Sequence, residues 1–221
     1  MDLQIYNGTS SLKKQAYTKL LEQLNSYPED KLIRILEFGS GKSTRFFVDY
    51  KTIFNKNLEI TSFENDINLG YHKQTEELCL TLNIRNLIEC SDADFNNQME
   101  SKIFNKQLFY NKMTPLTWRQ RNCIYNILSG DLSGIYDIIV IDGPNGNGRT
   151  LLNSIFSPYV ASDTIILMDD YNSRDNEYDY KFVEHIYRFF NLEELYTHDG
   201  DSENTFEYGG NFKVYKIIDI I

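Results

Sequence analysis

The chain has 221 residues, of which 41% are hydrophobic and 24% charged, and its formal net charge is −10. This length and composition predict a single globular α/β domain over residues 1–221, while the acidic balance argues against a general nucleic-acid binder, which needs a basic surface. No apolar run approaches the length of a membrane span. Three widely spaced cysteines, Cys79, Cys90 and Cys123, predict reduced thiols and an intracellular, cytoplasmic protein.

The first 30 residues predict a helical cap. Apolar residues recur at helical spacing from Leu12 to Leu24, and the preceding turn, residues 7–11, contains threonine and serine residues that are good helix N-caps. Pro28 follows the helix and ends it.

A strand, a glycine turn and a helix follow in that order. Ile33, Ile35 and Leu36 predict a short buried strand, the chain then turns at Gly39-Ser40-Gly41, and residues 43–50 predict a helix. In open α/β sheets this succession builds nucleotide sites, because glycines let the backbone approach a ligand and helix N-terminal amides attract polar groups.

Two nucleotide motifs match this turn incompletely. Gly41-Lys42-Ser43 fits the second half of a phosphate loop, but Leu36 stands where its first glycine belongs, and Glu37 would repel a phosphate. A dinucleotide fingerprint requires glycine or alanine at the position of Thr44.

A third interpretation retains the acid. Residues 37–41, Glu-Phe-Gly-Ser-Gly, resemble the first motif of class I S-adenosylmethionine-dependent methyltransferases. The resemblance implies that Glu37 meets the cationic methionine end of the cofactor and that a leading helix covers it. It also implies that this end of the cofactor lies along the turn, formed by Gly39, Ser40, Gly41, Ser43 and Thr44.

The second strand is predicted over residues 58–63 and ends in Glu64-Asn65. Glu64 follows Gly41 at a spacing close to the roughly 20 residues at which a carboxylate binds ribose hydroxyls in dinucleotide folds. We expect Glu64 and Asn65 to bind the ribose, although an exposed loop acid is the alternative.

Residues 71–82 predict a helix and residues 86–90 a third strand, followed by Asp92-Ala93. In the family, a carboxylate at this place binds the adenine amino group, which assigns Asp92 and Ala93 to the cofactor. Asp94 lies next to them, so either acid could instead be merely solvated.

A long polar and aromatic stretch, residues 95–134, precedes the next strand and predicts either a helical crossover or a lid. Residues 117–128 predict a helix within it. Trp118, the only tryptophan, is a candidate substrate platform, and core packing is the equal alternative.

Two apolar strands end in acids. Residues 136–141 form the strongest predicted strand and end at Asp142, whereas residues 164–168 end at Asp169 and Asp170. Unpaired, three carboxylates at one sheet edge would repel one another, and a divalent cation such as Mg²⁺ would resolve the conflict. Loop-tip acids without a metal are the alternative.

This acid set resembles the metal triad of Mg²⁺-dependent O-methyltransferases, of both the catechol type and the sugar-modifying macrocin type. The loop from Asp142 to Arg149 is also similar to methyltransferases of plant glucuronoxylan and of viral capsid glycans. The resemblance covers roughly residues 9–172. One departure is Asn145, which stands where catechol-type enzymes carry a lysine base, so either Asp142, the predicted catalytic residue, or another residue must take the proton.

The C-terminal part predicts a helix over residues 178–190 and closing strands over 192–196, 206–208 and 212–217. The candidates for contacting the acceptor are Trp118, Arg149, Tyr171 and His198, although a solvated loop position is the alternative for His198.

The sequence thus predicts a Rossmann-like class I methyltransferase fold, with a mostly parallel, seven-stranded sheet between helices. The predicted activity is S-adenosylmethionine-dependent O-methylation of a sugar or glycan hydroxyl, assisted by Mg²⁺ or another divalent cation. Three alternatives stay open: a catechol-like small-molecule acceptor, a phosphotransferase using Lys42, and a non-catalytic module that binds a partner through residues 95–134.

Overall fold

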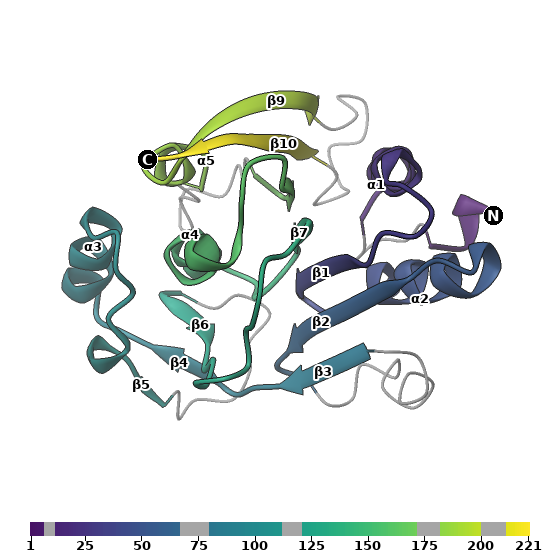
Figure 1. The fold of residues 1–221 in the computed structure, drawn as a ribbon. Coiled ribbons are helices and arrows are strands. Elements are labelled where there is room, and N and C mark those ends of the chain that lie inside the picture. The colour runs from purple at the N-terminus through teal and green to yellow at the C-terminus, as the bar shows by residue number, and fades with distance from the viewer. Residues whose placement is uncertain (7–11, 67–79, 112–120, 172–181, 200–210) are drawn as a thin grey trace.

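The computed structural model describes residues 1–6, 12–66, 80–111, 121–171, 182–199 and 211–221. Within these residues the centre is a seven-stranded sheet in the order β3-β2-β1-β7-β8-β10-β9 (Figure 1). Its strands are β1 (Ile33–Phe38), β2 (Leu58–Glu64), β3 (Leu80–Ile84), β7 (Ile138–Ile141), β8 (Ile165–Asp169), β9 (Phe190–Asp199) and β10 (Asn211–Ile220).

The five neighbouring strands β3, β2, β1, β7 and β8 are parallel, whereas β10 is antiparallel to both β8 and β9. The predicted α/β class, with a mostly parallel sheet between helices, is therefore confirmed. Because β1 is central and parallel to its neighbours, its carboxyl end lies between the carboxyl ends of β2 and β7. This edge is where ligands bind in open sheets.

Two apolar cores cover the two faces of the sheet. One face packs on the short 3-10 helix η1 (Leu3–Tyr6), on α1 (Lys14–Ser26) and on α2 (Lys42–Phe54). The other packs on α3 (Asp92–Glu100), η4 (Asn147–Leu151), α4 (Leu152–Phe156), α5 (Phe182–Ile186) and a small antiparallel sheet, β5-β4-β6.

The small sheet is absent from the sequence prediction. It consists of β4 (Leu87–Glu89), β5 (Tyr110–Asn111) and β6 (Cys123–Tyr125), and a 3-10 helix, η3 (Lys106–Leu108), precedes β5. The prediction that residues 86–90 are the third strand of the main sheet is wrong, because β3 pairs with β2 and β4 lies beyond it. Both segments are short and apolar, so local pattern does not separate them.

Two predicted helices also differ from the structure. Residues 80–82 of the predicted 71–82 helix belong to β3, and the rest of that helix lies outside the described residues. Residues 123–125 of the predicted 117–128 helix are β6, because they pair with β4. The apolar residues of each segment satisfied helical spacing, but non-local strand pairing decided the outcome.

The C-terminal helix is shorter than predicted in the described residues, where α5 ends at Ile186 and β9 begins at Phe190. β9 and β10 both extend beyond the predicted strands of residues 192–196 and 212–217. The predicted strand of residues 206–208 lies outside the described residues.

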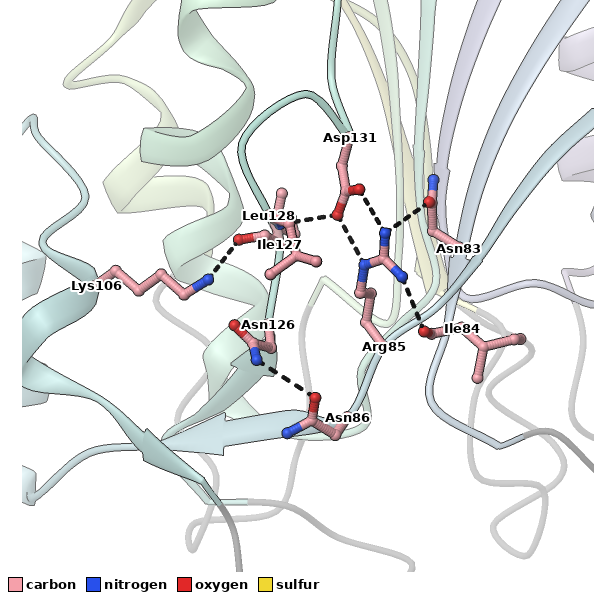
Figure 2. A network of polar contacts seen from close by, with 9 residues as sticks. All are labelled: Asn83, Ile84, Arg85, Asn86, Lys106, Asn126, Ile127, Leu128 and Asp131. Carbon is pink, nitrogen blue, oxygen red and sulfur yellow. Dashed lines mark hydrogen bonds and ion pairs between the residues drawn. The ribbon is translucent and has the colours of Figure 1, made fainter.

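A network of polar contacts attaches the segment after β6 to the edge of the main sheet. Figure 2 shows the Arg85 guanidinium between Asp131 and Asn83, and its Nε donates to Asp131 at 2.8 Å. Lys106 donates to the carbonyl of Ile127 at 2.7 Å. Asp131 is thereby fixed to the end of β3, and Ile127 to Lys106 of η3. The part of residues 95–134 that the structure describes is therefore anchored at several points.

In the described part of the chain, none of the helices has both the length and the apolar character needed to cross a membrane. Cys90 and Cys123 are buried and form no disulfide in the described part of the chain, whereas Cys79 lies outside the described residues.

Candidate functional site

The glycine turn is pressed against the ends of two neighbouring strands. The amides of Gly39 and Ser40 donate to the Phe63 carbonyl at 2.9 and 3.1 Å. Gly39 has φ +98°, and a Cβ added there would lie 2.8 Å from the Asp142 carbonyl carbon and the Gly143 nitrogen. The turn and the first residues after β7 therefore form one continuous wall at the carboxyl edge.

Alanine substitutions at Gly39 and Gly41, the two glycines of the turn, should have different effects on stability. Gly39→Ala should destabilise the fold by at least about 2 kcal/mol, because alanine is disfavoured at positive φ and its methyl group meets backbone. Gly41→Ala should change the free energy of unfolding by less than about 1 kcal/mol, because Gly41 is extended at φ −179° and nothing lies within 4 Å of the added methyl group. Urea denaturation of both variants checks this, and equal losses would contradict the geometry.

Glu37 lies beneath the turn and is fully buried. Its Oε2 accepts hydrogen bonds from the hydroxyls of Thr44 and Ser62, both at 2.5 Å, whereas Oε1 has no hydrogen-bond partner. Thr44 also accepts a hydrogen bond from the Gly41 amide at 2.9 Å, which caps the start of α2. Glu37 thus connects β1, β2 and the first turn of α2.

Burial raises the pKa of Glu37 from its ordinary value of 4.5 to about 7, against the opposing effect of the hydroxyl hydrogen bonds. A carboxyl with a raised pKa adds stability that is complete below pH 4.5 and is lost as the pH rises through 7.

Glutamine does not titrate, so the free energy of unfolding of Glu37→Gln relative to the wild type should increase by up to about 3 kcal/mol as the pH rises from 4 to 8. The amide oxygen can still accept from Ser62 and Thr44, so the hydrogen bonds alone do not cancel the gain. Urea denaturation at both pH values measures it. Glu59→Gln, an exposed substitution on β2, is the control. If the stability of Glu37→Gln relative to the wild type were the same at pH 4 and pH 8, the raised pKa of Glu37 would be refuted.

Glu64 ends β2 and is buried, with 5% of its surface exposed. Its Oε1 accepts hydrogen bonds from the amides of Asn65 and Asp66 at 2.7 and 3.0 Å. Asn65 itself is half-buried. The strand tip therefore holds Glu64 in a fixed position next to the glycine turn, because β1 and β2 are adjacent.

Asp92 was predicted to follow a strand of the main sheet, but it follows a strand of the small sheet. It begins α3, is exposed, and pairs with Arg121 at 2.8 Å, while Asn122 donates to it at 2.7 Å. Ala93 is exposed beside it. The two residues follow the small sheet, so the structure does not bring them to the carboxyl end of a main-sheet strand.

The acids after β7 and β8 do come together, around an arginine. Arg149 is 1% exposed, and its Nη2 lies 3.8 Å from Asp142 Oδ1 while its Nη1 lies 3.6 Å from Asp170 Oδ2. Asp169, the last residue of β8, is 6% exposed, and its Oδ1 has no hydrogen-bond partner. Arg149, predicted to contact the acceptor, is instead interior.

The predicted magnesium site receives no support from this arrangement. Among the residues that the structure describes, no three histidine, cysteine or acidic side chains are grouped so that they could hold a metal ion. Asp142 and Asp170 each lie within 4 Å of the Arg149 guanidinium, on two different nitrogens. The residues present therefore do not fit the metal that the resemblance implies.

Burial raises the pKa of Asp142 to about 7, with Arg149 and a hydrogen bond with Asp169 lowering it and the charges of Asp170 and Glu64 raising it. The pKa of Asp169 is raised well above its ordinary value, first by burial and then by the charges of Asp142 and Asp170. A carboxylate with a pKa near neutral pH, whose side chain remains 21% exposed, can accept a proton from a ligand. Asp142 has these properties.

Tyr171 and His198 lie further along the same edge. The Tyr171 hydroxyl donates to Asp199 at the end of β9, and Lys213 Nζ lies 4.9 Å from the tyrosine ring centre. His198 packs on Phe212 with ring centres 5.5 Å apart, and Phe212 pairs with Asp169. One strand therefore separates His198 from the acids. Trp118 lies outside the described residues.

Tyr125 is a residue of the site that the sequence does not predict. From β6 it stacks on Phe38 and packs at a tilt on Phe63, with ring centres 6.3 and 6.2 Å away, and a Cβ added at Gly143 would lie 2.4 Å from its hydroxyl. Its placement depends on β6 pairing with β4, which the predicted helix concealed. Ser62 is a further partner of Glu37 that was not predicted, although a polar residue within an apolar strand was the available signal.

The turn does not have the properties of a phosphate loop. Lys42 is exposed at the start of α2, whereas Ser43 and Thr44 are buried. Leu36 is a buried residue of β1, and a carboxylate lies beneath the turn. Asn145, the replacement for a catechol-type lysine, is exposed and accepts a hydrogen bond from Arg149 at 3.1 Å.

No protein-family model and no curated protein matches this chain. Among solved structures, a precorrin-6y C5,15-methyltransferase from Geobacter metallireducens is 11% identical, with a TM-score of 0.49, and covers 96% of this chain and 93% of its own. Fibrillarin from Aeropyrum pernix, with natively bound S-adenosyl-L-methionine, is 13% identical over 91% and 76%, with a TM-score of 0.47.

A TDP-rhamnose 3'-O-methyltransferase of calicheamicin biosynthesis is 12% identical, with a TM-score of 0.45, and the match covers 90% of this chain and 76% of that one. At these identities and TM-scores the likeness assigns neither a family to this chain nor a role to any of its residues.

Proposed function

We propose that this protein is an S-adenosylmethionine-dependent O-methyltransferase that acts on a hydroxyl group of a sugar or glycan. The observation that carries the proposal is the close contact of the Gly39 turn with Asp142 and Gly143. It joins a strand–glycine–helix ligand site to a carboxylate whose pKa is about 7. A cofactor site and a base therefore share one edge of the sheet.

The residues along this edge fit the cofactor. Glu37 has a buried oxygen without a hydrogen-bond partner, and the space in front of Gly41 is open. We propose that Glu37 and the turn hold the methionine end and that Glu64 with Asn65 holds the ribose. When bound, S-adenosylmethionine supplies an electrophilic methyl group. Asp92 and Ala93 end no strand of the main sheet, but Asn122 joins Asp92 to Asn147, which begins η4 after β7, and we propose them as the adenine contacts.

Asp142 is the proposed catalytic base. Its carboxylate accepts the proton of the acceptor hydroxyl as that oxygen becomes methylated. A sugar hydroxyl is far less acidic than a catechol, so a base placed at the reacting oxygen matters more for this acceptor class. The partly exposed Asp170 and Tyr171 are the neighbouring groups that we propose face the acceptor.

The sugar acceptor is supported by the resemblance of the loop from Asp142 to Arg149 to sugar-modifying methyltransferases. The same loop lacks the catechol-type lysine, since Asn145 occupies its place. The proposed reaction includes no metal, because the carboxylates at the edge already contact a buried guanidinium.

Calorimetric titration with S-adenosylmethionine and, separately, with ATP tests the proposal. We expect saturable binding of S-adenosylmethionine near one per chain and none of ATP. Binding of ATP alone would instead support a phosphotransferase, and Lys42→Ala should then abolish it. Binding of neither would favour a non-catalytic module.

A further inference from the structure

Arg149 joins the carboxyl ends of two strands from inside the protein. Its Nε donates to the Pro144 carbonyl at 2.7 Å, its Nη2 to the Asp142 carbonyl at 2.6 Å, and its Nη1 to the Asp169 carbonyl at 3.3 Å. Nη2 also donates to Asn145 Oδ1 at 3.1 Å. All three guanidinium nitrogens are thus used, and the planar fork fixes the ends of β7 and β8 relative to each other.

The same guanidinium is the cation of the acid set. Asp142 and Asp170 each place a carboxylate oxygen within 4 Å of it, on two different nitrogens. Asp169 is buried next to them, with one oxygen lacking a hydrogen-bond partner. Because arginine does not lose its proton in proteins, this positive charge is permanent.

A divalent cation would need a different arrangement. Magnesium requires oxygen ligands that converge on one point at about 2.0–2.1 Å, usually with several waters. The described residues contain no such group, and Asp142 and Asp170 each lie within 4 Å of the Arg149 guanidinium instead. Carboxylates that converged on a metal there would bring it against a buried like charge, which is costly.

We infer that Arg149 takes the place of a divalent cation at this edge, as the counter-ion that positions Asp142 and holds the two strand ends. The inference rests on the proposed function in one respect, namely that Asp142 is the base. The contacts of Arg149 do not depend on the proposed function. In this arrangement Arg149 is a positioning residue, since it reaches the site through Asp142 and Asp170.

The inference predicts that removing the guanidinium creates a metal site. In Arg149→Met, a side chain of similar length loses its charge and its ion pairs, so Asp142, Asp169 and Asp170 are no longer held by the guanidinium and can converge on a metal ion. Mn²⁺ should then raise the melting temperature of the variant by roughly 4 °C or more over its value in EDTA, because a ligand that binds only the folded state stabilises it. Arg149→Lys keeps the charge and should show no such response.

The wild-type protein supplies the second measurement, which does not depend on a variant that folds. Calorimetric titration with Mn²⁺ and with Mg²⁺ should show no saturable binding, and the melting temperature should be the same in EDTA and in either metal. Binding near one ion per chain, lost in Asp169→Asn, would overturn the inference. A folded Arg149→Met variant that ignores Mn²⁺ would also contradict it.

Neither measurement uses S-adenosylmethionine or an acceptor. A failure of the proposed methyltransferase function would therefore leave these results unchanged, and a wild-type metal site would leave the cofactor titration unchanged. The two proposals are tested separately.

Discussion

Replacing Asp142 with asparagine is expected to lower kcat by about 10²–10⁴-fold, the usual contribution of a general base. The substitution preserves size, and the main-chain carbonyl that accepts from Arg149 remains. In the wild type, methyl transfer should rise with pH up to about 7, because Asp142 must be deprotonated to accept the hydroxyl proton. In Asp142→Asn this pH dependence should disappear from the residual rate.

The measurement is the pH profile of kcat with a sugar acceptor, together with the affinity for S-adenosylmethionine. Asp163→Asn is the matched control, since Asp163 is a loop acid at positive φ, where asparagine is well tolerated, and its side chain is 79% exposed. A variant at Asp142 that retained the wild-type rate and profile would assign the base to another residue.

Replacing Glu64 with glutamine is expected to weaken S-adenosylmethionine binding by about 10–100-fold. A hydrogen bond to a charged group contributes about 1.5–3 kcal/mol, and every 1.4 kcal/mol is a tenfold change in affinity. Glu64 is well placed for such a bond, because two backbone amides hold its Oε1 at the tip of β2.

Titration calorimetry of wild-type and Glu64→Gln protein measures this change. Glu59→Gln, on the same strand with a half-exposed side chain paired to Arg34, is the control and should bind normally. If both variants bound alike, Glu64 would be only a structural residue of the strand tip. A loss of binding with unchanged melting temperature separates the ligand role from a folding defect.

The arginine among the carboxylates changes how the acid set is interpreted. From the sequence, three acids after two strands suggested a metal, because unpaired carboxylates at one edge repel one another. The structure retains that reasoning but supplies a different cation, Arg149. The repulsion is relieved in part only, since Asp169 keeps one buried oxygen unpartnered.

The sequence by itself determined the first strand, the glycine turn and the helix after it, as well as the acids at the tips of β1, β2, β7 and β8. These features are local: an apolar run, glycines in a row and a helix start all lie within a few residues of one another. Because these four strands run parallel in one sheet, their carboxyl ends lie at the same edge.

Only the tertiary structure decided that residues 87–89 and 123–125 belong to a second sheet, that Tyr125 stacks on Phe38, and that Arg149 lies inside the acid set. Each of these depends on partners far apart in the chain. A short apolar segment fits a helix or either sheet equally well until its hydrogen-bond partner is present. Arg149 can be buried because carbonyls from two strand ends accept its hydrogen bonds, and no local sequence pattern shows that these carbonyls converge.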